Sequence, residues 1–306
     1  MECTPSNPVL APLRKVGTHN GLTSLTTRLR EIEAWLGDDL HALDAAVTSL
    51  VAELSAPDPG GQERRAAGHL LGNPGKRIRP LCVLLGARFG GRGLDPMVRG
   101  LAVSSELIHA ATLLHDDVLD QGVERRGAPT ARVVYGNPVS ILAGDHLLVQ
   151  ALQRVSKCGF PQLLTDVLDV IDEMVRAEAL QLARRNQIPE NLDHARATYL
   201  EVVHGKTASL FRWSLQAGAT LAGLDAGSVE VLGRVGLHLG TAFQVVDDLL
   251  DIRGEPQLTG KGVWVDLEEG KLTWPLLVML ERCPELHREL CAQPELLGQS
   301  QARLRK

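Results

Sequence analysis

Six aspartates form two groups with the same spacing, D-D-x-x-D. The groups are Asp116, Asp117 and Asp120 in HDDVLD, and Asp247, Asp248 and Asp251 in VVDDLLDIRG. Each group ends an apolar run of helical character, so its first and last aspartates share one helix face. Like charges at this spacing repel by roughly 0.2–0.5 kcal/mol per pair, and by more when they are partly buried. A solvated helix end could explain one group alone, but two copies indicate that the carboxylates bind cations.

Basic side chains recur in short loops flanked by glycine or proline. Each one taken singly is explained as an ordinary surface residue, but their repetition next to the paired aspartates favours a shared anionic ligand. The residues are Lys76, Arg77 and Arg79 in GKRIRP, Arg125 and Arg126 in ERRG, Lys206 and Thr207 in HGKTA, Lys261 in TGKG, and Lys271 in EGKLTWP.

Paired carboxylates together with clustered cations are typical of diphosphate chemistry. Magnesium prefers octahedral oxygen ligands and is commonly held by carboxylates and substrate phosphates. Arginine and lysine can bind the outer phosphate oxygens, arginine as a bidentate fork. These positive charges stabilise a diphosphate as it departs. An apolar bundle interior beneath them can hold a hydrocarbon and keep water from a carbocation.

The elements that must position these residues are helices. Aromatic residues make up only 3% of the chain, while leucine and alanine abound, and no stretch alternates as a strand would. Glycine and proline stand mostly between the apolar runs, as helix breakers do. The predicted fold is therefore all-α, a single large helical bundle with a central apolar cavity. The predicted helical stretches are 25–54, 80–90, 97–120, 139–155, 163–185, 195–223, 228–254 and 270–283.

Composition excludes several other classes of protein. The net charge of −5 over 306 residues gives no basic surface for nucleic acid. Five cysteines without a C-x-x-C pair favour the reducing cytoplasm, and no apolar run reaches the roughly 18–20 residues of a membrane span. We expect residues 1–20 to form a flexible N-terminal tail without a signal peptide, and residues 21–306 to form one catalytic domain.

The order of the motifs resembles that of the trans-isoprenyl diphosphate synthases, in the polyprenyl synthetase family, and most closely its medium- and long-chain members. The resemblance covers nearly the whole chain. It rests on NPGKRIRP, ATLLHDDVLDQGVERRGAPT, GNPVSILAGDHLL, VVHGKTASLF, FQVVDDLLDIRG and TGKGVWVDLEEGKLTWPLL. It implies a 1'-4 condensation, in which an allylic diphosphate ionises and the resulting cation alkylates the double bond of isopentenyl diphosphate. It also implies a homodimer.

The resemblance assigns roles by position. Both aspartate groups would bind magnesium, with about three ions present once substrate is bound. The catalytic residues implied by the resemblance are Asp116, Asp117, Asp120, Asp247, Asp248 and Lys206. Isopentenyl diphosphate would be bound by Lys76, Arg79, His109 and Arg126. The allylic diphosphate would be bound by Arg125, Lys206, Thr207, Gln244, Lys261 and Lys271. The length of the product would be set by Ala111, Thr112 and Ile108, which precede the first aspartate group and lead down the same helix.

The product prediction follows from side-chain size. Bulky aromatics at or near Ala111 and Thr112 close the pocket in short-chain members, and both residues are small here. We therefore expect a product longer than farnesyl diphosphate, of about six to eight isoprene units by analogy. The alternative is that these two residues only pack against a neighbouring helix.

The sequence departs from the family pattern at a few positions. Pro74 and Trp264 stand where glycine is usual, Ala177 replaces the glycine before Glu178, and the C-terminal part is shorter than usual.

Two rival functions use related motifs. A class I terpene cyclase would need no acceptor site, so GKRIRP and ERRG argue against it, as does the scarcity of aromatics that could cradle a cation. A non-catalytic partner subunit of a heteromeric synthase would usually lack one aspartate group, and both are present.

Overall fold

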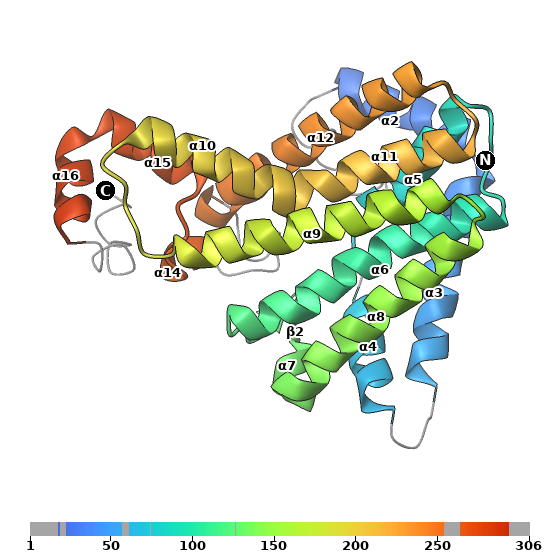
Figure 1. Ribbon diagram of the computed structural model, residues 1–306, viewed down its shortest axis with the longest axis horizontal. Helices are drawn as coiled ribbons and strands as arrows, with labels where there is room; N and C mark the ends of the chain where they lie inside the picture. The colour runs from blue at the N-terminus through green and yellow to red at the C-terminus, as the bar shows by residue number, and fades with distance from the viewer. Residues whose placement is uncertain are drawn as a thin grey trace. The chain divides into compact units, whose positions relative to one another are not determined.

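A computed structural model of the chain describes residue 18 and residues 23–56, 61–73, 75–125, 127–253 and 264–293. In this part of the chain the only strands are β1 (Glu124–Arg125) and β2 (Ala128–Pro129), which pair antiparallel, and the other elements are helices (Figure 1). The all-α prediction is confirmed. The structure divides into two compact units. The first unit contains Met1–Val123, Thr130–Leu164 and Ser214–Leu232, and the second contains Glu124–Pro129, Thr165–Trp213 and Gly233–Lys306.

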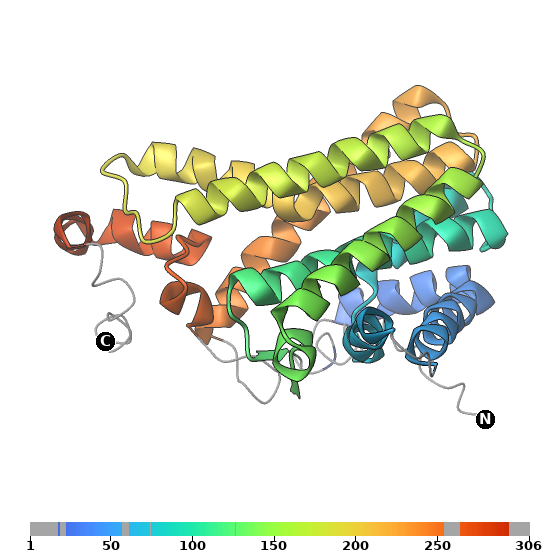
Figure 2. The same ribbon diagram turned by 60° about the horizontal axis from the view of Figure 1, so that its bottom comes forward.

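The complete helices in the described part of the first unit are α2 (Thr23–Leu36), α3 (Asp38–Ser55), α4 (Gln62–Gly72), α5 (Ile78–Phe89), α6 (Pro96–Leu119), α7 (Ala131–Tyr135) and α8 (Asn137–Lys157). Helices α3, α4, α5, α7 and α8 contact α6. Helices α6 and α8 run side by side (Figures 1 and 2). Two hydroxyls hydrogen-bond across this contact, since Ser104 donates to the Ala151 carbonyl at 3.1 Å and Ser140 donates to the Leu114 carbonyl at 3.0 Å.

Helix α6 begins at a strong start signal. The carboxylate of Asp95 accepts the backbone N–H groups of Met97 and Val98 at 2.8 and 3.0 Å, and Pro96 occupies the first helical position. Both features satisfy or remove N–H groups that a helix start leaves without partners. Most residues between Leu101 and Leu114 are then buried, so the helix carries the first aspartate group out of the core.

Two glycines allow α5 to approach α11 (Ser209–Leu221) closely. A Cβ on Gly86 would lie 2.3 Å from the Leu215 carbonyl oxygen, and one on Gly218 would lie 2.0 Å from the Val83 carbonyl oxygen. No side chain fits at either distance. The glycines therefore fix the crossing of these helices within the first unit.

The second unit packs around two apolar clusters. Its elements are β1, β2, most of α9 (Pro161–Ala183), α10 (Leu192–Val203), the π-helix η1 (His204–Ala208), the first part of α11, most of α12 (Ala226–Arg253), α14 (Val265–Glu268), α15 (Trp274–Arg282) and α16 (Pro284–Ala292). One cluster contains Ile188, Leu267, Leu276, Leu280 and Leu290, and the other contains Ala195, Tyr199, Val203 and Leu277.

Two stretches that were predicted as continuous helices are interrupted. Gly37 adopts a positive φ of 52° and separates α2 from α3. The stretch 195–223 contains the π-turn η1, which holds Lys206 and Thr207. A π-turn inserts an extra residue into a helix and is frequent at functional sites. Within the described residues, no helix has both the length and the apolar character needed to cross a membrane.

Candidate active site

The first aspartate group lies at the C-terminal end of α6. Asp117 is 1% exposed, Asp116 and Asp120 are half-buried, and Asp120 caps the helix. The last turn of α6 contains no basic residue. A helix C-terminus carries partial negative charge, so carboxylates there are unfavourable until a cation neutralises them. This position suits a bound divalent ion.

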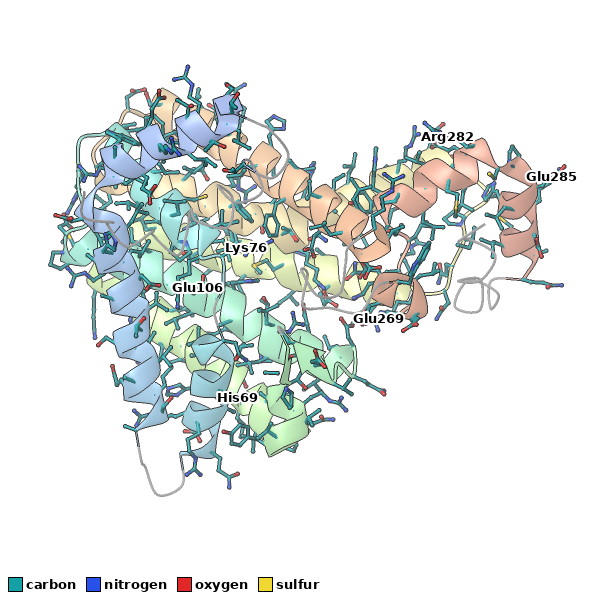
Figure 3. The ribbon with its side chains drawn as sticks, turned by 180° about the vertical axis from the view of Figure 1, so that it is seen from behind. His69, Lys76, Glu106, Glu269, Arg282 and Glu285 are labelled. Carbon is teal, nitrogen blue, oxygen red and sulfur yellow. The ribbon has the colours of Figure 1, made fainter. Side chains whose placement is uncertain are left out.

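The GKR loop presents its basic side chains differently. Lys76 is exposed on the loop before α5 (Figure 3). Arg77 adopts a positive φ of 45°, and its Nε lies 3.1 Å from the Asp44 carboxylate. Arg79 is only 9% exposed, in the first turn of α5. Burial raises the pKa of the Cys82 thiol to about 12, against the nearby positive charge of Arg79. Of the predicted acceptor-binding residues here, Lys76 is exposed and Arg79 is largely buried.

The three predicted chain-length residues, which precede the first aspartate group on α6, differ in their exposure. His109, Thr112 and Asp116 follow one another at three- and four-residue steps, and all three are half-buried. The Thr112 hydroxyl donates to the His109 carbonyl at 2.8 Å. Ile108 and Ala111, in contrast, are 0% exposed. Thr112 is therefore the predicted chain-length residue whose surface is accessible.

In the second aspartate group, both carboxylate oxygens of Asp248 accept hydrogen bonds. Asp248, 3% exposed, accepts the Gln244 amide at 2.9 Å on Oδ1. Its Oδ2 accepts the Tyr199 hydroxyl at 2.6 Å and the Trp274 backbone N–H at 3.4 Å. The Thr207 hydroxyl in turn donates to Gln244 Oε1 at 2.8 Å. The structure thus joins three predicted residues, Asp248, Gln244 and Thr207, in one network.

The pKa shifts in this network reflect its burial. Burial raises the pKa of Asp248, and the neighbouring charge of Asp247 adds to the rise, against the hydrogen bonds from Tyr199, Gln244 and Trp274. Burial also raises the pKa of Tyr199, and the charge of Asp248 raises it further. A neutral phenol that donates to a carboxylate agrees with the raised pKa of Tyr199, whereas the same hydrogen bond opposes the rise in the pKa of Asp248 that burial causes.

Asp251 connects the second aspartate group to the segment that begins at Trp264. Its carboxylate accepts the backbone N–H groups of Val265 and Asp266 at 3.1 and 3.4 Å. Its carbonyl accepts the Trp264 N–H at 2.8 Å. Trp264, where the family pattern has glycine, adopts a left-handed backbone with φ 69° and ψ 19°. Left-handed backbone is the conformation that favours glycine.

Two predicted cations of the second unit have acidic partners. Lys206 Nζ contacts the Glu178 carboxylate and donates to Gln181 Oε1 at 3.1 Å. Lys271 pairs with Glu269, which Figure 3 labels. These anions hold the two ammonium groups in place.

The π-turn that carries Lys206 packs tightly on α9. A Cβ on Gly205 would lie 2.7 Å from the Cβ of Ala177 and 3.0 Å from the Glu173 carbonyl oxygen. The methyl group of Ala177, which stands where the family pattern has glycine, therefore leaves no room for a side chain at position 205.

Three further predicted residues are Arg125, Arg126 and Lys261. Arg125 is half-buried on β1, opposite Ala128. Arg126 and Lys261 lie outside the described residues, as do Pro74 and, except for Thr18, the predicted N-terminal tail 1–20. In the described part of the chain, no three histidine, cysteine or acidic side chains form a group that could hold a metal ion.

Sequence reasoning did not identify Tyr199, Trp274 or Glu178 as site residues. A signal for Tyr199 exists, because it lies seven residues before Lys206, two helical turns along one face, and because the chain has only two tyrosines. No spacing rule connects Trp274 to Asp248, since the two meet only through the fold.

Comparisons with known proteins decide the family. The family named Polyprenyl synthetase matches residues 63–302. The chain belongs to the polyprenyl synthetase family. It is 38% identical over 253 residues to heptaprenyl diphosphate synthase component 2 of Geobacillus stearothermophilus, covering 83% of this chain and 76% of that protein. It is 39% identical over 209 residues to octaprenyl diphosphate synthase of Escherichia coli K12, covering 68% of this chain and 63% of that protein.

A solved structure supports the same assignment. A polyprenyl synthase from Caulobacter crescentus CB15, complexed with calcium and isoprenyl diphosphate, matches with a TM-score of 0.77 at 34% identity, over 88% of this chain and 79% of that one. The predicted family and enzyme class, a prenyltransferase of the polyprenyl diphosphate synthase type, are confirmed. The comparisons do not favour a terpene cyclase or a non-catalytic subunit.

Proposed function

We propose that this member of the polyprenyl synthetase family extends an allylic diphosphate with isopentenyl diphosphate by trans 1'-4 condensation. The observation that supports this most directly is the hydrogen-bonded set Thr207, Gln244 and Asp248 beside the paired Lys206. It provides hydrogen-bonded polar groups of defined orientation within the second unit. Such preorganised groups stabilise charge that develops in a transition state.

The two aspartate groups would hold Mg²⁺ together with the substrate diphosphate. Carboxylate oxygens at two helix ends fit a hard cation that usually keeps several ligands from water or phosphate. Bound Mg²⁺ would neutralise the leaving diphosphate. Lys206, Lys271 and Arg125 would bind the allylic diphosphate oxygens, and Lys76, Arg79 and Arg126 those of isopentenyl diphosphate. Thr207 and Gln244 would direct oxygen atoms toward the reacting carbons.

The product is proposed to be longer than farnesyl diphosphate. Thr112 offers a small, half-buried surface one turn before Asp116, so a growing chain could pass it. The chain's relatives include proteins named heptaprenyl and octaprenyl diphosphate synthase. We propose a product of about six to eight isoprene units by this analogy.

The chain is further proposed to act as a homodimer in the cytoplasm. On α8, Leu142 and Val149 are 58% and 53% exposed and lie two turns apart on one face. Contiguous exposed apolar patches mark subunit contacts, and we propose that these two residues belong to one. The described cysteines are free thiols, which agrees with a reducing compartment. Light scattering would give the mass in solution, and Leu142→Lys should lower it to that of a monomer.

One assay tests the activity. The protein is mixed with isopentenyl diphosphate, farnesyl diphosphate and Mg²⁺, and released diphosphate and product length are measured, the latter by mass spectrometry. We expect elongated prenyl diphosphates and one diphosphate released per unit added. A cyclic hydrocarbon formed without isopentenyl diphosphate would indicate a cyclase. Activity only after addition of a second protein would indicate a heteromeric synthase.

A further inference from the structure

The second unit contains a continuous line of hydrogen bonds that ends at Thr207. Tyr199 donates to Asp248 at 2.6 Å, Gln244 donates to Asp248 at 2.9 Å, and Thr207 donates to Gln244 at 2.8 Å. The line connects α10, α12 and η1. Tyr199 is its far end, and nothing in the family pattern described above gives that residue a role.

In this line, the donor and acceptor roles in one hydrogen bond determine the roles in the next hydrogen bond. A carboxylate can only accept, so Asp248 requires the NH₂ side of the Gln244 amide. The amide oxygen then faces Thr207 and accepts its single hydroxyl proton. The oxygen lone pairs of Thr207 are therefore the part of the hydroxyl left for another group. If Asp248 turned away, the Gln244 amide could flip and the hydroxyl could reverse its direction.

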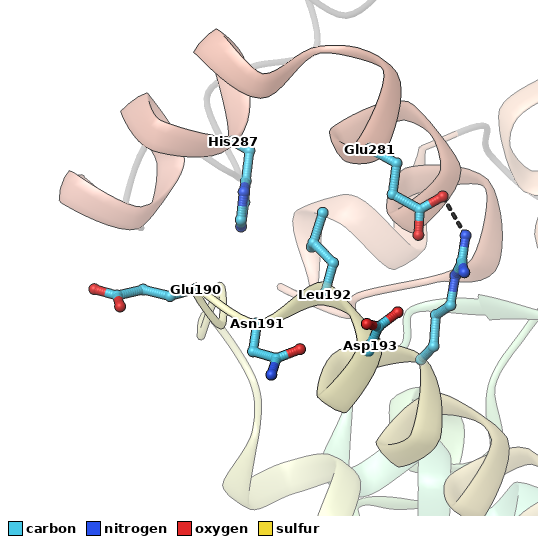
Figure 4. A pocket seen from close by; sticks show the side chains of 7 residues that line it. Glu190, Asn191, Leu192, Asp193, Glu281 and His287 are labelled. Carbon is cyan, nitrogen blue, oxygen red and sulfur yellow. Dashed lines mark hydrogen bonds and ion pairs between the residues drawn. The ribbon is translucent and has the colours of Figure 1, made fainter.

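Tyr199 is held firmly enough to fix Asp248. It is 8% exposed, and its ring lies 5.5 Å from the ring of Trp274. The guanidinium of Arg196 lies 5.8 Å above the Trp274 ring and pairs with Glu281. Figure 4 shows this ion pair between α10 and α15, at the wall of an open cleft. The Trp274 backbone N–H meets the same Asp248 oxygen as the Tyr199 hydroxyl.

We propose that Tyr199 is a positioning residue for the prenyl transfer. It holds Asp248 in one rotamer, Asp248 orients the Gln244 amide, and the amide directs the lone pairs of Thr207 toward the carbon that becomes positive. Tyr199 itself touches neither substrate nor metal. This inference rests on the proposed function, because it names the reaction that the network serves.

The direct test is Tyr199→Phe, which removes the hydroxyl and keeps the ring against Trp274. We expect kcat to fall about tenfold, which corresponds to about 1.4 kcal/mol, while KM for both substrates changes less than about twofold. Interactions that matter only in the transition state affect kcat in this way. The matched control is Tyr135→Phe, which alters the chain's other tyrosine, on α7 in the first unit. It should leave kcat unchanged.

A double-mutant cycle separates positioning from general stability. Gln244→Met removes the middle of the line, so adding Tyr199→Phe to it should lower kcat by less than about twofold. An equal loss in both backgrounds, or a loss only of thermal stability, would overturn the proposal. Wild-type protein that makes no prenyl diphosphate would instead refute the proposed function. In that case the same cycle, run on the free energy of unfolding, still tests the network, and additive effects there would refute it.

Discussion

Trp264 gives the sharpest test of how the structure accommodates an unusual residue. Its left-handed backbone (φ 69°, ψ 19°) costs a side chain with a Cβ roughly 1–2 kcal/mol, whereas glycine adopts it freely. The indole offsets this cost by packing against the cluster that contains Leu267 and Leu276. The tryptophan therefore combines a backbone penalty with a packing gain, and two substitutions can separate them.

We compare Trp264→Gly with Trp264→Ala. Both variants lose the indole packing, but only the alanine variant keeps the backbone strain. Glycine is normally destabilising relative to alanine by roughly 0.5–1 kcal/mol in regular structure, since it has more freedom when unfolded. Here the strain exceeds that entropy difference. We expect the glycine variant to be more stable than the alanine variant by roughly 0.5–1 kcal/mol. Urea unfolding followed by circular dichroism measures the difference.

The matched control is Trp35, a 45% exposed residue in α2. There the backbone is helical, so Trp35→Ala should be more stable than Trp35→Gly by up to about 1 kcal/mol. The sign of the glycine–alanine difference should thus reverse between the two tryptophans. An alanine variant at position 264 that equals or exceeds the glycine variant would refute the strain argument.

Three further predictions concern the reaction. Asp116→Ala and Asp247→Ala should each lower kcat by about 10²–10³-fold, because each removes charge from a proposed magnesium site; full activity of both variants, or of wild type in chelator, would contradict the mechanism. Arg125→Ala should raise KM for the allylic diphosphate by about tenfold through loss of a charge-assisted contact, and a rise in KM for isopentenyl diphosphate instead would contradict its assignment. Thr112→Phe should shorten the product with the first condensation retained, whereas Ala111→Phe should mainly lower the melting temperature, because overpacking a fully buried site costs about 1–3 kcal/mol. An unchanged product from Thr112→Phe would show that this face does not line the channel.

The helices could be predicted because apolar periodicity is a local property of the sequence. The stretch 97–120 directly follows a start signal at Asp95 and Pro96 and has a buried face along its length. The interruption at Gly37 was missed, since an amphipathic pattern continues across it and a single glycine is tolerated within many helices. The π-turn at 204–208 was missed for a related reason. It changes the backbone hydrogen bonds but hardly changes the pattern of apolar residues.

The types of the site residues could be predicted, but their hydrogen-bond partners could not. Lys206 was identified from its motif, yet the sequence gives no reason to pair it with Glu178, a residue of another helix. Likewise Tyr199 and Asp248 are 49 positions apart. A partner at that separation is chosen by the packing of helices, which depends on side chains along their whole length. Spacing rules reach only a few turns along one helix.

Two motifs with the same spacing can therefore have aspartates with different roles. In the second group Asp248 is occupied by three donors from Tyr199, Gln244 and Trp274, and Asp251 accepts the first N–H groups of the segment after Trp264. A metal-bound carboxylate can still accept hydrogen bonds, because its two oxygens offer about four lone-pair sites. Three donors already use such sites on Asp248, and any buried donor that a metal displaced would be left unpaired at a cost of about 1–3 kcal/mol. We therefore expect Asp248 to keep these three donors with or without a bound metal, and so to hold the Gln244 amide and the Thr207 hydroxyl in one orientation.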